Sequence, residues 1–220
     1  MAKVKLGILV SGSGTNLQAI LDATRSGALD AEVSLVISNQ PDVRALDRAK
    51  EAGILARVIS HRDFADRAAF DAELVAALGR AGVTHVVLAG FMRVLTAVLL
   101  DAFPWRVINI HPALLPAFPG IHAPRQALEY GVKVAGCTVH FVDAGTDSGP
   151  IIAQTAVPVL EGDTEETLSA RILGEEHRLL VAVLAAIADG DVEVIPAAGG
   201  SRPRVRVSER AARRFGGARL

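Results

Sequence analysis

The feature that most constrains the fold is an apolar run near the start of the chain that leads directly into a glycine-rich turn. Residues 6–10 show no polar alternation, which is the pattern of a parallel strand buried on both faces. Ser11-Gly-Ser-Gly-Thr-Asn16 follows, and then Leu17, Ile20 and Leu21 at helical spacing. A buried strand, a tight turn and an amphipathic helix in this order predict the first unit of a Rossmann-like sheet.

Apolar runs and helix-spaced segments keep alternating through the first half of the chain. Strands are predicted at 4–10, 33–38, 56–59, 84–89 and in the run that begins at Val107. Helices are predicted between them, ending near Gly53, near Gly79 and before Pro104. Parallel strands joined by helices place helices on both faces of one sheet. We therefore predict a mostly parallel, twisted α/β sheet with a Rossmann-like N-terminal half.

The second half is expected to depart from the parallel pattern. Residues 133–142 and 151–159 are strand-like, and the loop between them is too short for a helical crossover, so antiparallel pairing is expected. Asp163-x-x-Glu166 resembles a capping box and predicts the start of a helix with an apolar stripe through Ile172. Glu176 falls on that stripe. Because an inner carboxylate costs free energy unless it is paired, Glu176 either receives a ligand or sits on a helix rotated toward water.

Composition limits the number of domains and the class of protein, but it does not identify a function. At 220 residues and 50% hydrophobic, the chain can bury one sizeable core in one or at most two domains. A net charge of −1 gives no general attraction to nucleic acid or to a membrane surface. Cys137 is the only cysteine, so no intrachain disulfide forms, and it is expected to be a packed small hydrophobe. No apolar stretch has the length of a membrane span, and a cytoplasmic protein is expected.

The C-terminal segment differs from the rest of the chain. From Ser201 onward there are seven Arg and one Glu, among Gly, Ser and Pro residues and few large apolar ones. Such a composition predicts a tail that is mobile or lies across a neighbour. We therefore expect a catalytic domain over 1–198 and an Arg-rich mobile tail over 199–220. Without aromatic residues among the arginines, nucleic-acid binding is not expected.

The chemistry is expected where the Val107 strand ends in a proline-rich loop. Asn109 and His111 lie two residues apart, so in an extended segment their side chains leave the same face and converge on one small group. An Asn side chain can donate N–H groups to a developing oxyanion, and a His near neutral pH can give or take a proton. Asp147 could complete the set by favouring the charged imidazole and fixing its orientation. The alternative is that all three are ordinary loop residues.

A second candidate site is the turn before the first helix. Its glycines permit close backbone approach, and the helix N-terminus favours an anion, so Gly14, Thr15 and Asn16 could hold a phosphate. The turn lacks the third glycine of a dinucleotide motif, since Leu17 stands there, and lacks the Gly-Lys-Ser/Thr of a P-loop. A corner needed only for packing is the alternative.

Three motifs together carry a resemblance to a known family. They are Asn109-Ile-His-Pro-Ala-Leu-Leu-Pro116, Phe118-Pro-Gly-Ile-His122 and Asp143-x-Gly-x-Asp147-x-Gly-Pro-Ile-Ile152. In this order they resemble the 10-formyltetrahydrofolate-dependent formyltransferases, over roughly residues 4–195. Ala113 departs from the family, which often has Ser there. Among family members, the pattern is most similar to those that formylate glycinamide ribonucleotide in purine biosynthesis.

The resemblance implies roles for particular residues. It implies catalysis by Asn109, His111 and Asp147, with Gly14, Thr15, Asn16 and Glu176 on the phosphate and ribose of the substrate. The folate-binding residues it implies are Arg67, Met92, Arg93, Val94, Leu95, Asn109, Asp143, Ala144, Gly145, Thr146 and Asp147. The co-substrate is then 10-formyltetrahydrofolate, bound between the Met92 and Asp143 loops without a metal. The sequence leaves the oligomeric state open, a homodimer included.

Other functions remain open from the sequence. A transfer RNA formyltransferase would be expected to carry a further domain after the catalytic one. A dinucleotide-dependent oxidoreductase is disfavoured by Leu17, and by Glu32, which precedes the second strand where a ribose-binding acid is expected at that strand's end. A metallohydrolase could use His111, His122, His140 and Asp147, but no zinc-binding spacing supports it. A module that binds folate without catalysis is the last alternative.

Overall fold

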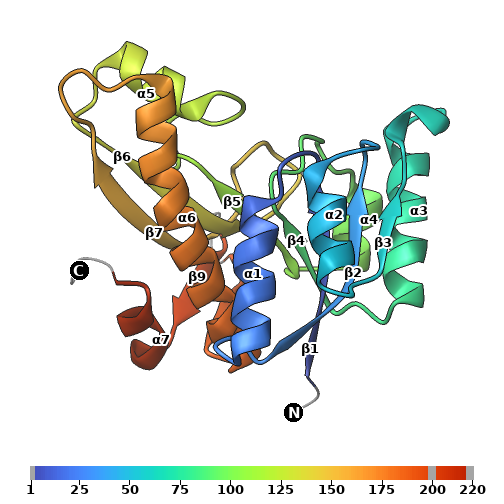
Figure 1. Cartoon of the computed structure of the whole chain (residues 1–220). Coiled ribbons are helices and arrows are strands. Elements are labelled where there is room, and N and C mark those ends of the chain that lie inside the picture. The colour runs from blue at the N-terminus through green and yellow to red at the C-terminus, as the bar shows by residue number, and fades with distance from the viewer. Residues whose placement is uncertain (1–2, 198–201, 217–220) are drawn as a thin grey trace. The chain divides into compact units, whose positions relative to one another are not determined.

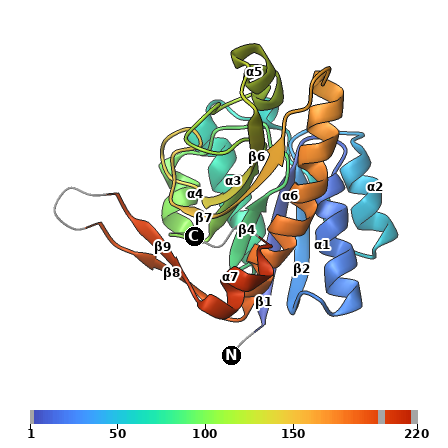
Figure 2. The ribbon, with the colours of Figure 1, turned by 90° about the vertical axis from the view of Figure 1, so that its left-hand side faces the viewer.

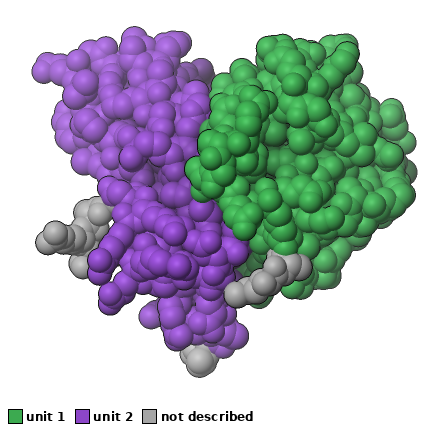
Figure 3. Space-filling model, turned by 60° about the horizontal axis from the view of Figure 1, so that its bottom comes forward, with its two compact units in different colours: residues 1–109 green, residues 110–220 purple. Residues whose placement is uncertain are grey.

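The computed structural model describes residues 3–197 and 202–216, which contain a seven-stranded sheet of order β3-β2-β1-β4-β5-β6-β7 and a small two-stranded sheet (Figure 1). The strands are β1 Val4–Val10, β2 Ala31–Ser38, β3 Ala56–Val58, β4 His85–Leu88, β5 Val107–His111, β6 Val134–Phe141, β7 Ile151–Pro158, β8 Val192–Ile195 and β9 Arg204–Val207. The helices are α1 Thr15–Ser26, α2 Arg44–Glu51, α3 Arg67–Arg80, α4 Ala97–Ala102, α5 Ala123–Tyr130, α6 Glu165–Ala188 and α7 Glu209–Arg214, with a 3-10 turn at His61–Asp63. The chain divides into two compact units, 1–109 and 110–220 (Figure 3).

The first unit has the predicted parallel α/β arrangement. Each neighbouring pair in the series β3-β2-β1-β4-β5 runs parallel. Helix α1 packs with α2, and α3 packs with α4. Figures 1 and 2 show the two pairs on opposite faces of the sheet. This follows from right-handed crossovers, because the chain moves outward from β1 to β3 and then returns across β1 to β4.

The central strand of the first unit is buried on both faces, as its unbroken apolar run predicts. Leu6, Ile8, Leu9 and Val10 of β1 are all fully buried. Removing this much apolar surface from water is the main driving force for folding of the unit. The carboxyl end of β1 is thereby fixed, and with it the position of the glycine turn that follows.

One buried histidine makes the stability of the fold depend on pH. Burial, and secondarily the positive charge of Arg106, lowers the pKa of His85 from 6.5 to about 4. The unfolded chain therefore binds a proton at His85 near pH 6.5, which the folded chain does not bind until about pH 4. The stability from neutral His85 is complete above pH 6.5 and is lost as the pH falls toward 4.

We therefore expect His85→Asn to flatten the acid side of the stability profile. Between pH 7.5 and 5 the wild-type chain should lose more unfolding free energy than the variant, because asparagine does not titrate. Urea denaturation at the two pH values measures the difference. Equal losses in the two proteins would show that His85 does not carry this dependence.

The second unit contains the predicted antiparallel pair and its covering helix. Strands β6 and β7 pair antiparallel, and α6 packs against both. Leu168, Ile172, Leu179 and Val183 of α6 are buried, as their spacing predicts. Glu176 is only 7% exposed. The alternative of a helix rotated to bring this carboxylate to water is therefore wrong.

The predicted capping box at the start of α6 is displaced by one residue. The N-cap is Thr164, whose side chain accepts from the backbone of Thr167, while the Thr167 side chain accepts from the Thr164 backbone. Asp163 instead accepts from the Leu160 amide and forms a two-pronged pair with Arg171. The arginine partner, eight residues away in the chain, holds the carboxylate and leaves the cap to threonine.

Residues 202–216 of the predicted Arg-rich tail form β9 and α7. Strand β9 pairs antiparallel with β8, and Figure 2 shows the pair beside α7. Two acidic residues just after α6 bind arginines of α7: Asp191 lies 2.7 Å from Arg210, and Asp189 lies 2.6 Å from Arg214. The arginines of α7 are thus paired with acidic residues that precede the segment. In β9, Val205 and Val207 alternate with arginines, which is the two-residue pattern of a strand. Residues 198–201 and 217–220, also in the predicted tail, lie outside the described residues.

Over the two described ranges, none of the helices combines the length and the apolar character that crossing a membrane requires.

Candidate active site

The candidate catalytic residues of β5 lie at its carboxyl end. Asn109 and His111 are both within the strand, so their two-residue spacing directs them to the same side of it. Asn109 is half-buried and His111 is 4% exposed. The loop after β5 contains Pro112, Pro116 and Pro119, which restrict its backbone as predicted. A stiff loop therefore begins at the candidate catalytic histidine.

His111 is held between two acceptors. Its Nδ1 lies 3.4 Å from Oδ2 of Asp147, and its Nε2 lies 2.9 Å from the carbonyl oxygen of Phe118. A carbonyl oxygen can only accept, so Nε2 carries a proton, and a second proton on Nδ1 would face the carboxylate. The arrangement suits the doubly protonated imidazolium, the form that can stabilise an oxyanion. The contact expected between His111 and Asp147 is present.

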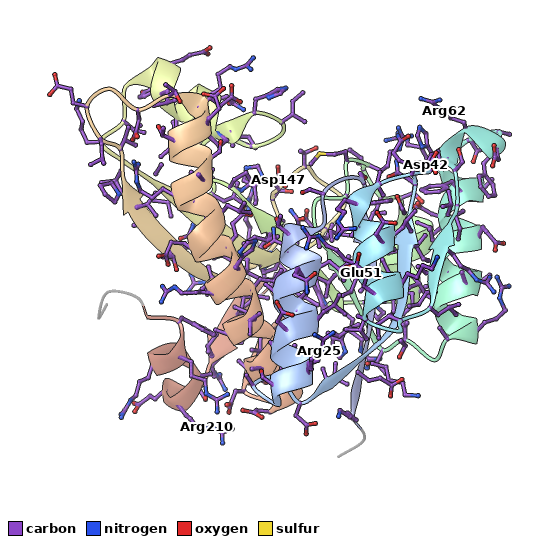
Figure 4. The ribbon with its side chains drawn as sticks, viewed as in Figure 1. Arg25, Asp42, Glu51, Arg62, Asp147 and Arg210 are labelled. Atoms are coloured by element: carbon purple, nitrogen blue, oxygen red, sulfur yellow. The ribbon has the colours of Figure 1, made fainter. Side chains whose placement is uncertain are left out.

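Asp147 is fixed by its backbone and by the loop that it contacts. It has a φ of 50°, in the left-handed region, and the Gly120 amide donates to its Oδ2 at 2.8 Å. Its carboxylate, labelled in Figure 4, thus joins its own loop to the loop that follows β5. A side chain at Gly149 would collide with the Phe141 carbonyl, so glycine is required for this loop to lie against β6.

His140 is a second histidine beside Asp147. Its Nε2 lies 3.8 Å from Oδ1 of Asp147, and its Nδ1 lies 2.8 Å from the Phe141 carbonyl, to which it donates. Burial lowers the pKa of His140 below its usual 6.5. Asp147 therefore lies between two buried histidines, with Oδ2 nearest His111 and Oδ1 nearest His140.

The glycine turn has a packing constraint as well as its anion-binding potential. Gly14 is the N-cap of α1 with φ 70°, and a Cβ there would lie 2.8 Å from Cα of Ala45 in α2. Only glycine allows this approach. Thr15 and Asn16 form the first turn of α1, where backbone N–H groups and the helix dipole favour an anion. The packing and phosphate interpretations of this glycine are therefore compatible.

The segment between β4 and α4 carries the first group of candidate folate residues, Met92 to Leu95. Met92 and Val94 are 68% and 50% exposed, whereas Leu95 is 7% exposed, and no helix begins before Ala97. The Met92 amide donates to Oγ of Ser11, the first residue of the glycine turn. Arg67, the first residue of α3, is exposed. The apolar side chains of Met92 and Val94 are thus available to a ligand.

The second group lies in the loop before β7. The carboxylate of Asp143 accepts from the Gly145 amide at 3.0 Å and from the Ser148 hydroxyl at 2.7 Å. Ala144, Gly145 and Thr146 are exposed. Asp143 therefore shapes the loop from within, while the three residues after it lie exposed at the surface.

Glu176 lies on the inner face of α6 in the second unit. Burial raises the pKa of the Cys137 thiol to about 12, and the charge of Glu176 adds to the increase. Cys137 is fully buried and stays protonated at neutral pH, in agreement with its predicted packing role. Within the described part of the chain, no group of three or more His, Cys, Asp or Glu side chains is arranged to hold a metal ion.

The sequence did not single out two backbone groups of this site, the Phe118 carbonyl and the Gly120 amide. They bind His111 and Asp147, respectively. The only signal for them was their place in the Phe118-Pro-Gly motif, because backbone contacts of this kind depend on how a loop folds back rather than on side-chain type.

The fold and the site define an α/β enzyme with a buried histidine–carboxylate pair at the end of a parallel strand, a class suited to chemistry at a carbonyl group. Formyl transferase is the family whose sequence profile matches residues 4–184, and the chain belongs to it.

Similar proteins extend this assignment. The chain is 42% identical over 187 residues to the phosphoribosylglycinamide formyltransferase of Escherichia coli, covering 85% of this chain and 88% of that protein. It is 47% identical to the Mycobacterium tuberculosis protein of the same name, covering 88% and 89%. The crystal structure of glycinamide ribonucleotide transformylase 1 from Symbiobacterium toebii has a TM-score of 0.89 and 52% identity, covering 93% of this chain and 94% of that one.

Some relatives are far longer. The trifunctional purine biosynthetic protein adenosine-3 of Drosophila melanogaster is 50% identical over 194 residues, and the match covers 87% of this chain but only 14% of that protein. The chain therefore corresponds to a small part of the length of these trifunctional relatives.

Proposed function

We propose that this protein transfers the formyl group of 10-formyltetrahydrofolate to the primary amine of glycinamide ribonucleotide, a step in de novo purine biosynthesis. The observation that carries the proposal is the buried contact between His111 and Asp147, on the strand that also holds Asn109. The names of bacterial relatives that the chain matches over nearly their whole length support the substrate. We assign the catalytic domain to residues 1–198, which include the family match at 4–184.

The proposed reaction is an acyl transfer. The amine nitrogen attacks the formyl carbon, and a tetrahedral intermediate forms whose oxygen carries negative charge. The bond from this carbon to N10 of the folate then breaks, the amine loses one proton, and N10 gains one. The products are the formylated amine and tetrahydrofolate.

In this mechanism Asn109 and His111 stabilise the oxyanion. The amide of Asn109 donates an N–H hydrogen bond, and the imidazolium of His111 donates a second one and supplies a positive charge. Asp147 favours the charged form of His111 and orients its ring. Since Nε2 of His111 donates to the Phe118 carbonyl in the free protein, that hydrogen bond must be exchanged for one to the substrate. Hydrogen bonds in catalytic sites often reach their working geometry only when the substrate binds.

The binding assignments rest on the resemblance and on the local structure. We propose that Gly14, Thr15 and Asn16 hold the phosphate of the ribonucleotide, and that Glu176 binds its ribose hydroxyls. The proposed folate contacts are Arg67, Met92, Arg93, Val94, Leu95, Asn109, Asp143, Ala144, Gly145, Thr146 and Asp147. Arg67 is assigned from its place in the family pattern, and its side chain is exposed at the first position of α3.

The proposal predicts that loss of the formyl group from the donor depends on the amine substrate. We expect the absorbance change of donor deformylation in the presence of glycinamide ribonucleotide and no change in its absence. Deformylation without the amine would identify a donor hydrolase instead. Folate binding without deformylation under either condition would identify a binding module. A sugar amine that replaced glycinamide ribonucleotide at equal efficiency would reassign the acceptor.

A further inference from the structure

The segment between β4 and α4 is held at both ends by side chains that have no assigned role. This segment, residues 90–96, includes the four candidate folate residues from Met92 to Leu95. Most of its length has no regular secondary structure and two of its apolar side chains are exposed. A loop of this kind needs contacts outside itself to keep one conformation.

The end of the segment is anchored on a buried carboxylate of α3. Oδ2 of Asp71 accepts from the Thr96 amide at 2.6 Å and from the Thr96 hydroxyl at 2.7 Å. Asp71 is 1% exposed. A carboxylate at this depth is costly unless it is hydrogen-bonded, and the amide and the hydroxyl of Thr96 both donate to it. The neighbouring Phe70 also stacks on Phe91, at 6.5 Å between ring centroids.

The Thr96 hydroxyl is used for this anchor in place of a helix cap. Thr96 is the N-cap residue of α4, yet its side chain makes no capping hydrogen bond. A threonine cap typically stabilises a helix by about 1 kcal/mol. The local structure thus forgoes a usual stabilising interaction of α4 and instead binds Thr96 to α3. This indicates that the position of the segment, rather than the stability of α4, is what the contact secures.

The start of the segment is anchored on the glycine turn. Oγ of Ser11 accepts from the Met92 amide at 2.9 Å and donates to Oδ1 of Asn39 at 2.6 Å. The Ser11 amide donates to the Gly90 carbonyl. Asn39 is 2% exposed and its amide nitrogen lies 3.2 Å from Nδ1 of His61. Ser11 therefore joins the candidate folate segment to the turn that leads to the candidate phosphate-binding residues.

We propose that Asp71 is a positioning residue of the folate site, and that with Ser11 it fixes the shape of residues 92–95 before the folate binds. This rests on the proposed function. The two anchors differ in what they connect. The Asp71–Thr96 anchor holds the folate segment alone, so weakening it acts on folate affinity. Ser11 holds the folate segment and the glycine turn, so its loss acts on both substrates.

The test compares two matched threonine-to-valine substitutions in the first unit. Thr96→Val removes the hydroxyl that binds Asp71 and keeps the size of the side chain. Thr84→Val is the control: its hydroxyl also bridges two elements, accepting from the Lys5 amide and donating to the Lys5 carbonyl, at the opposite end of β1 and β4. Thr96→Ser retains the hydroxyl and serves as the conservative rescue.

We expect Thr96→Val to raise KM for 10-formyltetrahydrofolate about tenfold, since a hydrogen bond to a charged group is lost. KM for glycinamide ribonucleotide and kcat should stay within about twofold. Thr96→Ser should behave as wild type, and Thr84→Val should lower the melting temperature without changing either KM. Ser11→Ala should raise both KM values. An equal rise of both KM values in Thr96→Val, no rise, or the same rise in Thr84→Val would overturn the proposal.

Hydrogen exchange tests the Asp71–Thr96 anchor independently of whether the protein transfers a formyl group. The amides of residues 92–96 should be protected in the wild-type protein without ligand and lose protection in Thr96→Val, while the amides of β1 stay protected in both. Unchanged protection at 92–96 refutes the anchor even if the enzyme is active. Absence of formyl transfer by the wild-type protein refutes the function, and the exchange result still decides the anchor.

Discussion

Asp147→Asn should lower turnover about hundredfold or more while the protein stays folded, because general acid–base assistance typically contributes a factor of that size. Asparagine keeps an oxygen that can accept from the Gly120 amide, so the loop contact at 2.8 Å survives. What is lost is the negative charge 3.4 Å from Nδ1 of His111. Without it the doubly protonated ring is no longer favoured, and the oxyanion loses its positive partner. Steady-state turnover with saturating substrates measures the effect.

Asp191→Asn is a suitable control for this change. It removes the same charge from the second unit, where the carboxylate binds Arg210 at 2.7 Å. Because the Arg210 side chain is 61% exposed and asparagine keeps an oxygen that can accept from it, the expected loss of stability is about 1 kcal/mol, and turnover should not change. If Asp147→Asn turned over at the wild-type rate, or if both variants slowed equally, Asp147 would have no specific role at His111.

Much of the fold could be predicted from the sequence because local patterns and the final packing agree. The unbroken apolar run at 6–10 can satisfy burial only as a central strand, and it is one. The short connection between β6 and β7 admits only antiparallel pairing, which is observed. In each case one physical constraint excludes the alternatives. The meeting of His111 and Asp147 was expected from the motif order and is present.

Features set by distant partners could not be predicted in the same way. Asp163 has the sequence signature of a helix cap, but Arg171 binds it and Thr164 takes the cap. The arginine content of the C-terminal segment likewise gave no indication that Asp191 binds Arg210 and that Asp189 binds Arg214. Such outcomes depend on which charged groups lie close in space, and sequence composition does not contain that information.

Asn109→Ala should reduce kcat by a hundredfold or more, equivalent to about 3 kcal/mol of transition-state stabilisation. The amide of Asn109 is proposed to donate to an oxygen that becomes fully charged only in the tetrahedral intermediate, so its loss should affect kcat far more than either KM. Asn109 lies within β5, paired in register with Leu88 of β4, and alanine is compatible with that strand. The fold should therefore be retained.

Asn109→Asp tests whether Asn109 acts through its N–H donor or only through the shape of its side chain. Aspartate has nearly the same size but cannot donate when ionised, and its charge repels the developing oxyanion. It should therefore be slower than Asn109→Ala, whereas a role in shape alone predicts that it is faster. Rates of the two variants, compared at matched thermal stability, decide between these roles. An Asn109→Asp variant as active as the wild type would exclude Asn109 as the oxyanion donor and leave His111 as the only proposed one.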